Sequence, residues 1–186
     1  VDAAPAPSAD FGTPPSDPAP SVPFKGRTWP RVAFSPEGGV EARLIEALSA
    51  CDWSVDVAIF SFYSQAVADA LIAAKGRGIA VRVAADISQS RRSPAIKSLR
   101  AAGVSLRFSA GRDGVGVLHH KLMIFDGEML ATGSFNFSQN AEKFNFENQF
   151  FTAESGDLAA YQEEFEAVWA QARETVPEAH GQERLP

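Results

Sequence analysis

The residues best suited to chemistry lie between His119 and Asn136. His119 and Lys121 are two apart in a segment that reads as a strand, so both side chains leave the same face. Ser134 and Asn136, across a predicted hairpin, are also two apart, so their side chains also leave one face. An imidazole beside a fixed cation, together with a hydroxyl and an amide, forms a cradle for a tetrahedral phosphate. The spacing therefore predicts a phosphate site that holds a nucleophile or acid.

Asp126 belongs to the same stretch but has a different predicted role. It lies seven residues after His119, so it does not share that face of the strand. With Gly127 it forms an Asp-Gly pair, which is a strong signal for a two-residue hairpin turn. We expect Asp126 to be structural and to hold the hairpin.

The whole stretch from His119 to Asn136 reads H-x-K-x4-D-x6-G-S-x-N. Six fixed positions give a chance match of roughly one in a million for a chain of this length. The pattern resembles the HKD signature of the phospholipase D superfamily. Residues from about 31 to 171 resemble its single-motif, Nuc-type bacterial endonucleases, and Asn145–Asn148 resembles their downstream N-x-E-N element.

This resemblance implies a two-step displacement at phosphorus. One histidine attacks to form a phosphohistidine, and a second protonates the leaving oxygen and then activates water. The implied catalytic set is His119, Lys121, Ser134, Asn136 and Glu147, with Glu147 accepting the ring N–H of a catalytic histidine. No metal or cofactor is expected, because Lys121 and its symmetry mate supply the positive charge.

The second histidine is not evident within one chain. Only one HKD motif is present, and the other histidines are His120 and His180. His120 points to the opposite strand face, where a packed or edge role fits it better, and His180 lies in a tail without catalytic neighbours. We therefore expect a homodimer that places two His119 side chains around one phosphate. Whether Glu147 serves its own chain or the partner stays open.

Charge gives a mixed indication about the substrate. The net charge of −6 and the pI of about 5.1 argue against non-specific attraction to nucleic acid. However, residues 88–112 contain six basic residues and no acid. Arg91 and Arg92 are expected to steer phosphates, with a solvated surface as the alternative, and Gly133 is expected to contact substrate. The Gly111–Gly116 loop could form a flexible lip.

Hydrophobic periodicity predicts an α/β sandwich with a central mixed β-sheet flanked by helices. The predicted strands are 32–34, 53–61, 79–85, 104–108, 118–125, 129–133 and 146–152, and the predicted helices are 40–51, 64–74, 94–102 and a C-terminal one. The latter should bury its apolar stripe and expose Glu163, Glu164 and Glu166 to water. These elements define one nuclease domain at 31–175 and a tail at 176–186.

The remaining segment, residues 1–30, is predicted to be a disordered Pro/Ala-rich leader. A removed signal peptide or anchor would explain such a start and favours an exported protein, periplasmic or secreted; a boundary chosen within a longer chain is the alternative. The single Cys51 excludes an intramolecular disulfide and a cysteine zinc cluster. No run of about 18 apolar residues occurs, so no membrane insertion of this chain is expected.

Three functions fit this sequence. The leading one is an endonuclease of little sequence preference that cleaves DNA, and whether it also cleaves RNA stays open. The alternative keeps the chemistry but acts on phospholipid head groups, as phospholipase D and cardiolipin synthase do; those relatives usually carry two motifs in a longer chain. A non-catalytic scaffold is the third, and the intact motif argues against it.

Overall fold

A central sheet organises the computed structural model, which describes residues 20–174. Its seven strands run in the order β3-β9-β8-β7-β4-β5-β6. Strands β4, β5 and β6 are parallel and the other neighbours are antiparallel, so the sheet is mixed. The strand bounds are β3 Val32–Ser35, β4 Ser54–Ile59, β5 Ala80–Asp86, β6 Ser105–Ser109, β7 Lys121–Phe125, β8 Met129–Gly133 and β9 Glu147–Thr152.

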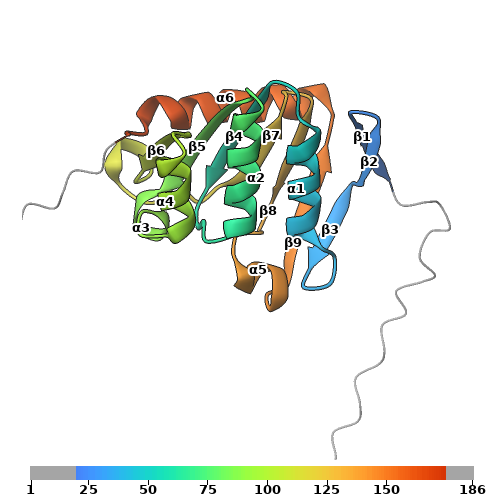
Figure 1. Ribbon diagram of the computed structural model, residues 1–186, viewed down its shortest axis with the longest axis horizontal. Coiled ribbons are helices and arrows are strands. Elements are labelled where there is room, and N and C mark those ends of the chain that lie inside the picture. The colour runs from blue at the N-terminus through green and yellow to red at the C-terminus, as the bar shows by residue number, and fades with distance from the viewer. Residues whose placement is uncertain (1–19, 175–186) are drawn as a thin grey trace, which may run out of the picture.

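Helices cover both faces of the sheet (Figure 1). One face carries α1 (Val40–Ala50), α2 (Gln65–Gly76) and α4 (Pro94–Ala101), and the other carries the long α6 (Ser155–Gln171). Strand β7 shows the two-sided packing: Met123 and Phe125 join the larger core, whereas Leu122 and Ile124 pack with Phe165 of α6. The predicted class, an α/β sandwich around a mixed sheet, is confirmed.

The topology gathers several loops at one edge of the sheet, the lower edge in Figure 1. Because β7 is antiparallel to β4, the start of β7 meets the end of β4, and Ile59 pairs with Lys121. The ends of β5, β6, β8 and β3 and the start of β9 meet at the same edge. The short helices α3 (Ile87–Ser90), η1 (Arg112–Gly114) and α5 (Gln139–Lys143) belong to these loops. We call this the site edge.

The structure corrects the predicted start of strand 118–125. Strand β7 begins at Lys121, so the two histidines before it lie outside the regular strand. The reason is that the backbone N–H of Leu118 donates to the carboxylate of Asp86, at 2.9 Å, and turns the chain toward β5. Helices α3 and α5 were not predicted, because they are too short to show helical periodicity.

The predicted leader is wrong for residues 21–30. They form a hairpin of β1 (Ser21–Phe24) and β2 (Arg27–Pro30). Val22, Phe24 and Trp29 are buried in the larger core, and the Trp29 indole N–H donates to Arg43 O at 3.2 Å. The folded unit therefore includes this hairpin. The rest of the leader, residues 1–19, and the tail lie outside the described residues, as does His180.

Membrane insertion was not expected, and one finding bears on it. Within residues 20–174, none of the helices combines the length and the apolar character that a bilayer span requires.

Trp29→Ala tests whether the hairpin is part of the fold. Removing a side chain that is only 2% exposed should lower the free energy of unfolding by about 3–5 kcal/mol. The exposed neighbour Thr28→Ala, on the same strand, should change it by less than about 0.5 kcal/mol. Urea denaturation followed by circular dichroism measures both. A decrease of less than about 1 kcal/mol in the unfolding free energy of Trp29→Ala would mean that the hairpin is not part of the folded unit.

Candidate active site

His119 and Lys121 lie side by side at the site edge, as their spacing predicts. The Lys121 side chain is buried, and its Nζ donates to the carbonyl oxygen of His119 at 2.7 Å. The same Nζ lies 3.3 Å from both ring nitrogens of His119. An ammonium equidistant from both nitrogens cannot lie along the in-plane lone pair of either one. Both nitrogens of the exposed His119 ring thus remain free of a directed bond from Lys121.

The charge of Lys121 is held in a partly desolvated place. Burial lowers the pKa of Lys121, and the nearby carboxylate of Glu147 opposes that shift. The ring of Phe60 lies against the pair: its centroid is 4.9 Å from Lys121 Nζ and 4.5 Å from the His119 ring centroid. A desolvated ammonium interacts with an anionic phosphate more strongly than a fully hydrated one does.

Ser134 and Glu147 form a second cluster at the same edge. The Ser134 hydroxyl donates to Glu147 Oε2 at 2.5 Å and accepts from the backbone N–H of Asn148 at 3.1 Å. The other carboxylate oxygen, Oε1, accepts from the side-chain amide of Asn145 at 2.9 Å. Both oxygens of Glu147 are therefore engaged within the chain. Among the described residues, no hydrogen bond joins Glu147 to His119.

Gly133 and Asn136 hold the segment around Ser134 in place. A Cβ at Gly133 would lie 2.2 Å from the carbonyl oxygen of Asn148, so only glycine allows β8 and β9 to approach this closely here. Asn136 Oδ1 accepts from the backbone N–H of Ser61 at 3.2 Å, which ties the segment to the end of β4. Both residues thus have structural roles, and substrate contact by Gly133 stays a prediction.

Asp86 and Ser90 were not predicted, although they support the site. Asp86 is fully buried; one oxygen accepts from the backbone N–H of Ser88 and Gln89, and the other accepts from Leu118 N, next to His119. The Ser90 hydroxyl donates to Phe60 O at 2.9 Å. The sequence signal was available: an aspartate directly after a buried strand, followed by serines, is typical of a helix N-cap.

Arg91 and Arg92 follow Ser90 directly and are exposed. Because Ser90 is bonded to Phe60, this basic pair lies at the site edge. The loop of residues 111–117 borders the site as well, since a hollow of about 160 Å³ is lined by Gly111, Arg112, Val117 and His119 among others. The geometry is consistent with the predicted roles of the arginines and of the loop, which stay predictions.

His120 contacts α6, which covers the other face of the sheet, as its parity predicts: its Nε2 lies 2.9 Å from Oε1 of Glu164. It is not separated from the motif pair, because His120, Glu164, His119 and Lys121 all line one cavity of about 320 Å³. The acidic face of α6 is thus not only solvated, as the sequence suggested. Glu164 pairs with His120, and Glu166 pairs with Arg82 at 2.6 Å.

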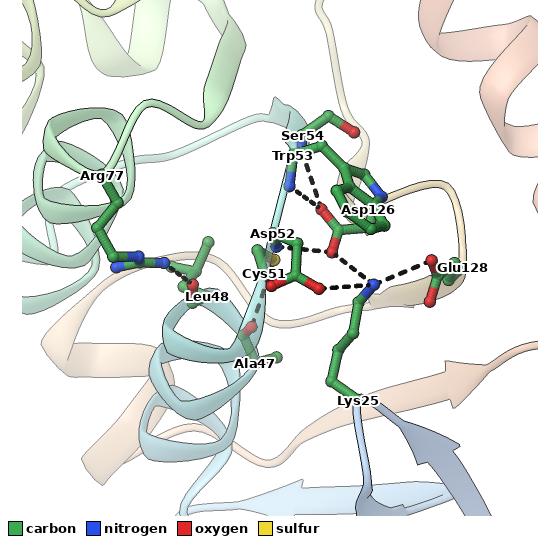
Figure 2. A network of polar contacts seen from close by, with 10 residues as sticks. All are labelled: Lys25, Ala47, Leu48, Cys51, Asp52, Trp53, Ser54, Arg77, Asp126 and Glu128. Atoms are coloured by element: carbon green, nitrogen blue, oxygen red, sulfur yellow. Dashed lines mark hydrogen bonds and ion pairs between the residues drawn. The ribbon is translucent and has the colours of Figure 1, made fainter.

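Asp126 directly follows Phe125, the last residue of β7, and Figure 2 shows its polar contacts. Its carboxylate accepts from the backbone N–H groups of Asp52, Trp53 and Ser54 at 2.8–2.9 Å, and Lys25 Nζ lies 3.2 Å away. Burial raises the pKa of Asp126, but these donors outweigh it and hold the pKa below the ordinary value of 3.8.

The motif aspartate therefore joins three separate elements. It terminates β7 with a positive φ of 53°, fixes the start of β4, and binds the β1–β2 hairpin through Lys25. Lys25 also reaches Asp52 and Glu128, and its ammonium lies 4.2 Å from the Trp53 ring centroid. The structure supports the predicted structural role of Asp126.

The fold and the motif together are those of a phospholipase D-like domain. The family model described as "Cardiolipin synthase, PLD-like domain" matches residues 44–169, so the chain belongs to this phospholipase D-like family. It is 34% identical over 129 residues to mitochondrial cardiolipin hydrolase from Xenopus tropicalis, covering 69% of this chain and 60% of that protein. The chain thus spans about 60% of that relative's length.

Solved structures show the same fold. The crystal structure of Nuc, a phospholipase D family member from Salmonella typhimurium, matches with a TM-score of 0.69 and 28% identity, over 76% of this chain and 94% of that one. NucT from Helicobacter pylori matches with a TM-score of 0.69 and 22% identity, over 76% and 96%. The second likeness concerns the fold alone.

Asp126→Asn tests the structural role of the motif aspartate. The amide would place an NH₂ group toward donors at Asp52 and Lys25, so we expect a loss of about 1.5–3 kcal/mol in unfolding free energy. Since the folded-state pKa is depressed, the wild-type advantage is present above about pH 4 and disappears as pH falls through the folded pKa. Denaturation curves at pH 7 and pH 3 measure the difference in unfolding free energy between the wild type and the variant at each pH. A constant difference at the two pH values would contradict this role.

Proposed function

We propose that this protein is a metal-independent endonuclease that hydrolyses nucleic acid phosphodiesters through a phosphohistidine at His119. The observation that carries the proposal is the exposed His119 imidazole with the buried Lys121 ammonium 3.3 Å from both of its nitrogens. Such a pair presents a nucleophile and a fixed positive charge to the same phosphate. Ser134 and Asn136 lie at the same edge of the sheet.

The reaction proceeds in two displacements. A ring nitrogen of His119 forms a bond to phosphorus, and the bond to the leaving oxygen breaks as a second histidine donates a proton to it. Water, deprotonated by that second histidine, then attacks phosphorus and releases His119. Lys121 stabilises the charge on the non-bridging oxygens in both steps.

The second histidine is proposed to be His119 of a partner copy. Exposed apolar side chains concentrate at the site edge, where Phe34 is 62%, Phe144 73% and Phe146 95% exposed. Apolar patches of this kind mark interaction surfaces. Phe146 directly precedes Glu147, so a copy that covers it would also meet the Ser134–Glu147 cluster. We propose that a two-fold dimer buries this aromatic surface, defined as Phe34, Phe144 and Phe146, and completes the site.

Nucleic acid is the proposed substrate because the exposed Arg112 lines the same hollow as His119. The exposed Arg91 and Arg92 directly follow Ser90, which is hydrogen-bonded to Phe60 at the site edge. A phospholipid is the second candidate. One observation favours it: the Xenopus relative is named for cardiolipin hydrolysis. Export, proposed from the Pro/Ala-rich composition of residues 1–19, would place the enzyme in the periplasm or outside the cell.

His119→Ala tests the chemistry. Wild-type protein should nick supercoiled plasmid in excess EDTA, whereas the variant should lose at least about 100-fold in rate, since it lacks the nucleophile. Agarose gels and a fluorescent phospholipid assay would be run in parallel. Cleavage of the lipid alone would move the substrate to phospholipids, and unchanged activity of the variant would contradict the mechanism.

Replacing both Phe144 and Phe146 by serine tests the dimer. We expect the protein to become monomeric and to lose at least about 100-fold in nicking rate, because the second catalytic histidine is removed. Trp53→Ser is the matched control, since Trp53 is 58% exposed but lies at the opposite edge of the sheet. Sedimentation velocity and plasmid nicking give the two readouts. A fully active monomer would exclude a shared site.

A further inference from the structure

Phe60 lies at the site edge with its backbone fixed on both sides. It follows the last residue of β4, and its N–H donates to the carbonyl oxygen of His120 at 2.9 Å. Its own carbonyl oxygen accepts from the Ser90 hydroxyl at 2.9 Å. The backbone of Phe60 is therefore held between the segments that carry His119 and the basic pair. A residue whose backbone is hydrogen-bonded on both sides can hold a neighbouring side chain in one orientation.

The ring of Phe60 contacts two chargeable groups of the motif, His119 and Lys121. Its centroid lies 4.5 Å from the His119 ring centroid, with the planes inclined by 54°, and 4.9 Å from Lys121 Nζ. Aromatic pairs at this separation attract one another, and a cation near a ring is attracted by the ring's quadrupole. Phe60 is half-buried, so these contacts are only partly screened by water.

The neighbouring phenylalanine shows a different arrangement. Phe62 is fully buried and packs edge-on against Phe137, with ring centroids 5.2 Å apart, as part of the larger core. Phe60 does not belong to either core cluster. Its ring instead lies against His119 and Lys121. Packing of the core therefore does not account for an aromatic residue at position 60.

We propose that Phe60 is a positioning residue for the phosphodiesterase reaction. Its ring fixes the orientation of the His119 imidazole and, through its quadrupole, stabilises the Lys121 ammonium and the cationic imidazole that forms when His119 bonds to phosphorus. The inference rests on the proposed function, because it assigns His119 as the nucleophile. It adds a residue outside the HKD motif on which the rate of the chemical step depends.

Kinetics give the first test. Phe60→Leu keeps an apolar side chain but removes the ring, and we expect kcat to fall roughly 3- to 30-fold with KM changed less than about two-fold. Phe60→Tyr keeps the ring and should retain most of the activity. Phe150→Leu is the control, since it removes a phenyl ring near another cation, Arg31, at 5.3 Å. It should leave kcat unchanged.

Nuclear magnetic resonance gives a second test that needs no turnover. The Phe60 ring current should displace the His119 ring-proton resonances in the wild type and in Phe60→Tyr. Phe60→Leu should shift them toward the values of a solvent-exposed histidine, whereas Phe150→Leu should not. These spectra remain informative even if no substrate is cleaved.

Three results would overturn the proposal: unchanged kcat in Phe60→Leu, equal losses in the Leu and Tyr variants, or His119 resonances insensitive to the ring. Shifted resonances in a protein without phosphodiesterase activity would instead support the positioning contact and count against the proposed function.

Discussion

The buried ammonium of Lys121 is the constraint that the rest of the site satisfies. Its desolvation disfavours the charged form, so the charge persists only where acceptors and electron-rich groups surround it. The fold supplies the carbonyl oxygen of His119 at 2.7 Å, the Phe60 ring, and the charge of Glu147. These groups come from the segment before β7, the end of β4 and the start of β9. The antiparallel pairing of Ile59 with Lys121 brings the first two together.

The motif residues at the two ends of β7 have different roles. At one end His119 and Lys121 lie together at the site edge. At the other, Asp126 connects β4, the β7–β8 turn and the β1–β2 hairpin through three backbone donors and Lys25 (Figure 2). The five residue steps from Lys121 to Asp126 span about 17 Å at a strand rise of about 3.3 Å each. Asp126 therefore cannot act on the phosphate directly, and its contribution is to hold the strand that positions His119 and Lys121.

The sequence predicted the elements with strong periodicity and the residues with fixed spacing. The sandwich with a mixed sheet followed from hydrophobic periodicity. Strand parity predicted the face on which His120 lies, and turn chemistry predicted the structural role of Asp126. The β1–β2 hairpin was missed because proline-rich composition outweighed three apolar residues, Val22, Phe24 and Trp29, whose burial depends on distant partners such as Phe125. The local pattern marks Asp86 as a helix N-cap, but the roles of Asp86 and Ser90 at the site depend on hydrogen bonds to Leu118 and Phe60, which are distant in the sequence.

The central claim is that His119 carries the phosphorus of the substrate, still esterified to one cleavage product, during the reaction. A turnover mixture of a short oligonucleotide substrate quenched in alkali, in which the histidine–phosphorus bond persists, can be digested and analysed by mass spectrometry. The account predicts a nucleotidyl adduct on the imidazole of His119 that disappears when the reaction is allowed to finish. An adduct on His120, or rapid turnover without an adduct on either histidine, would contradict it.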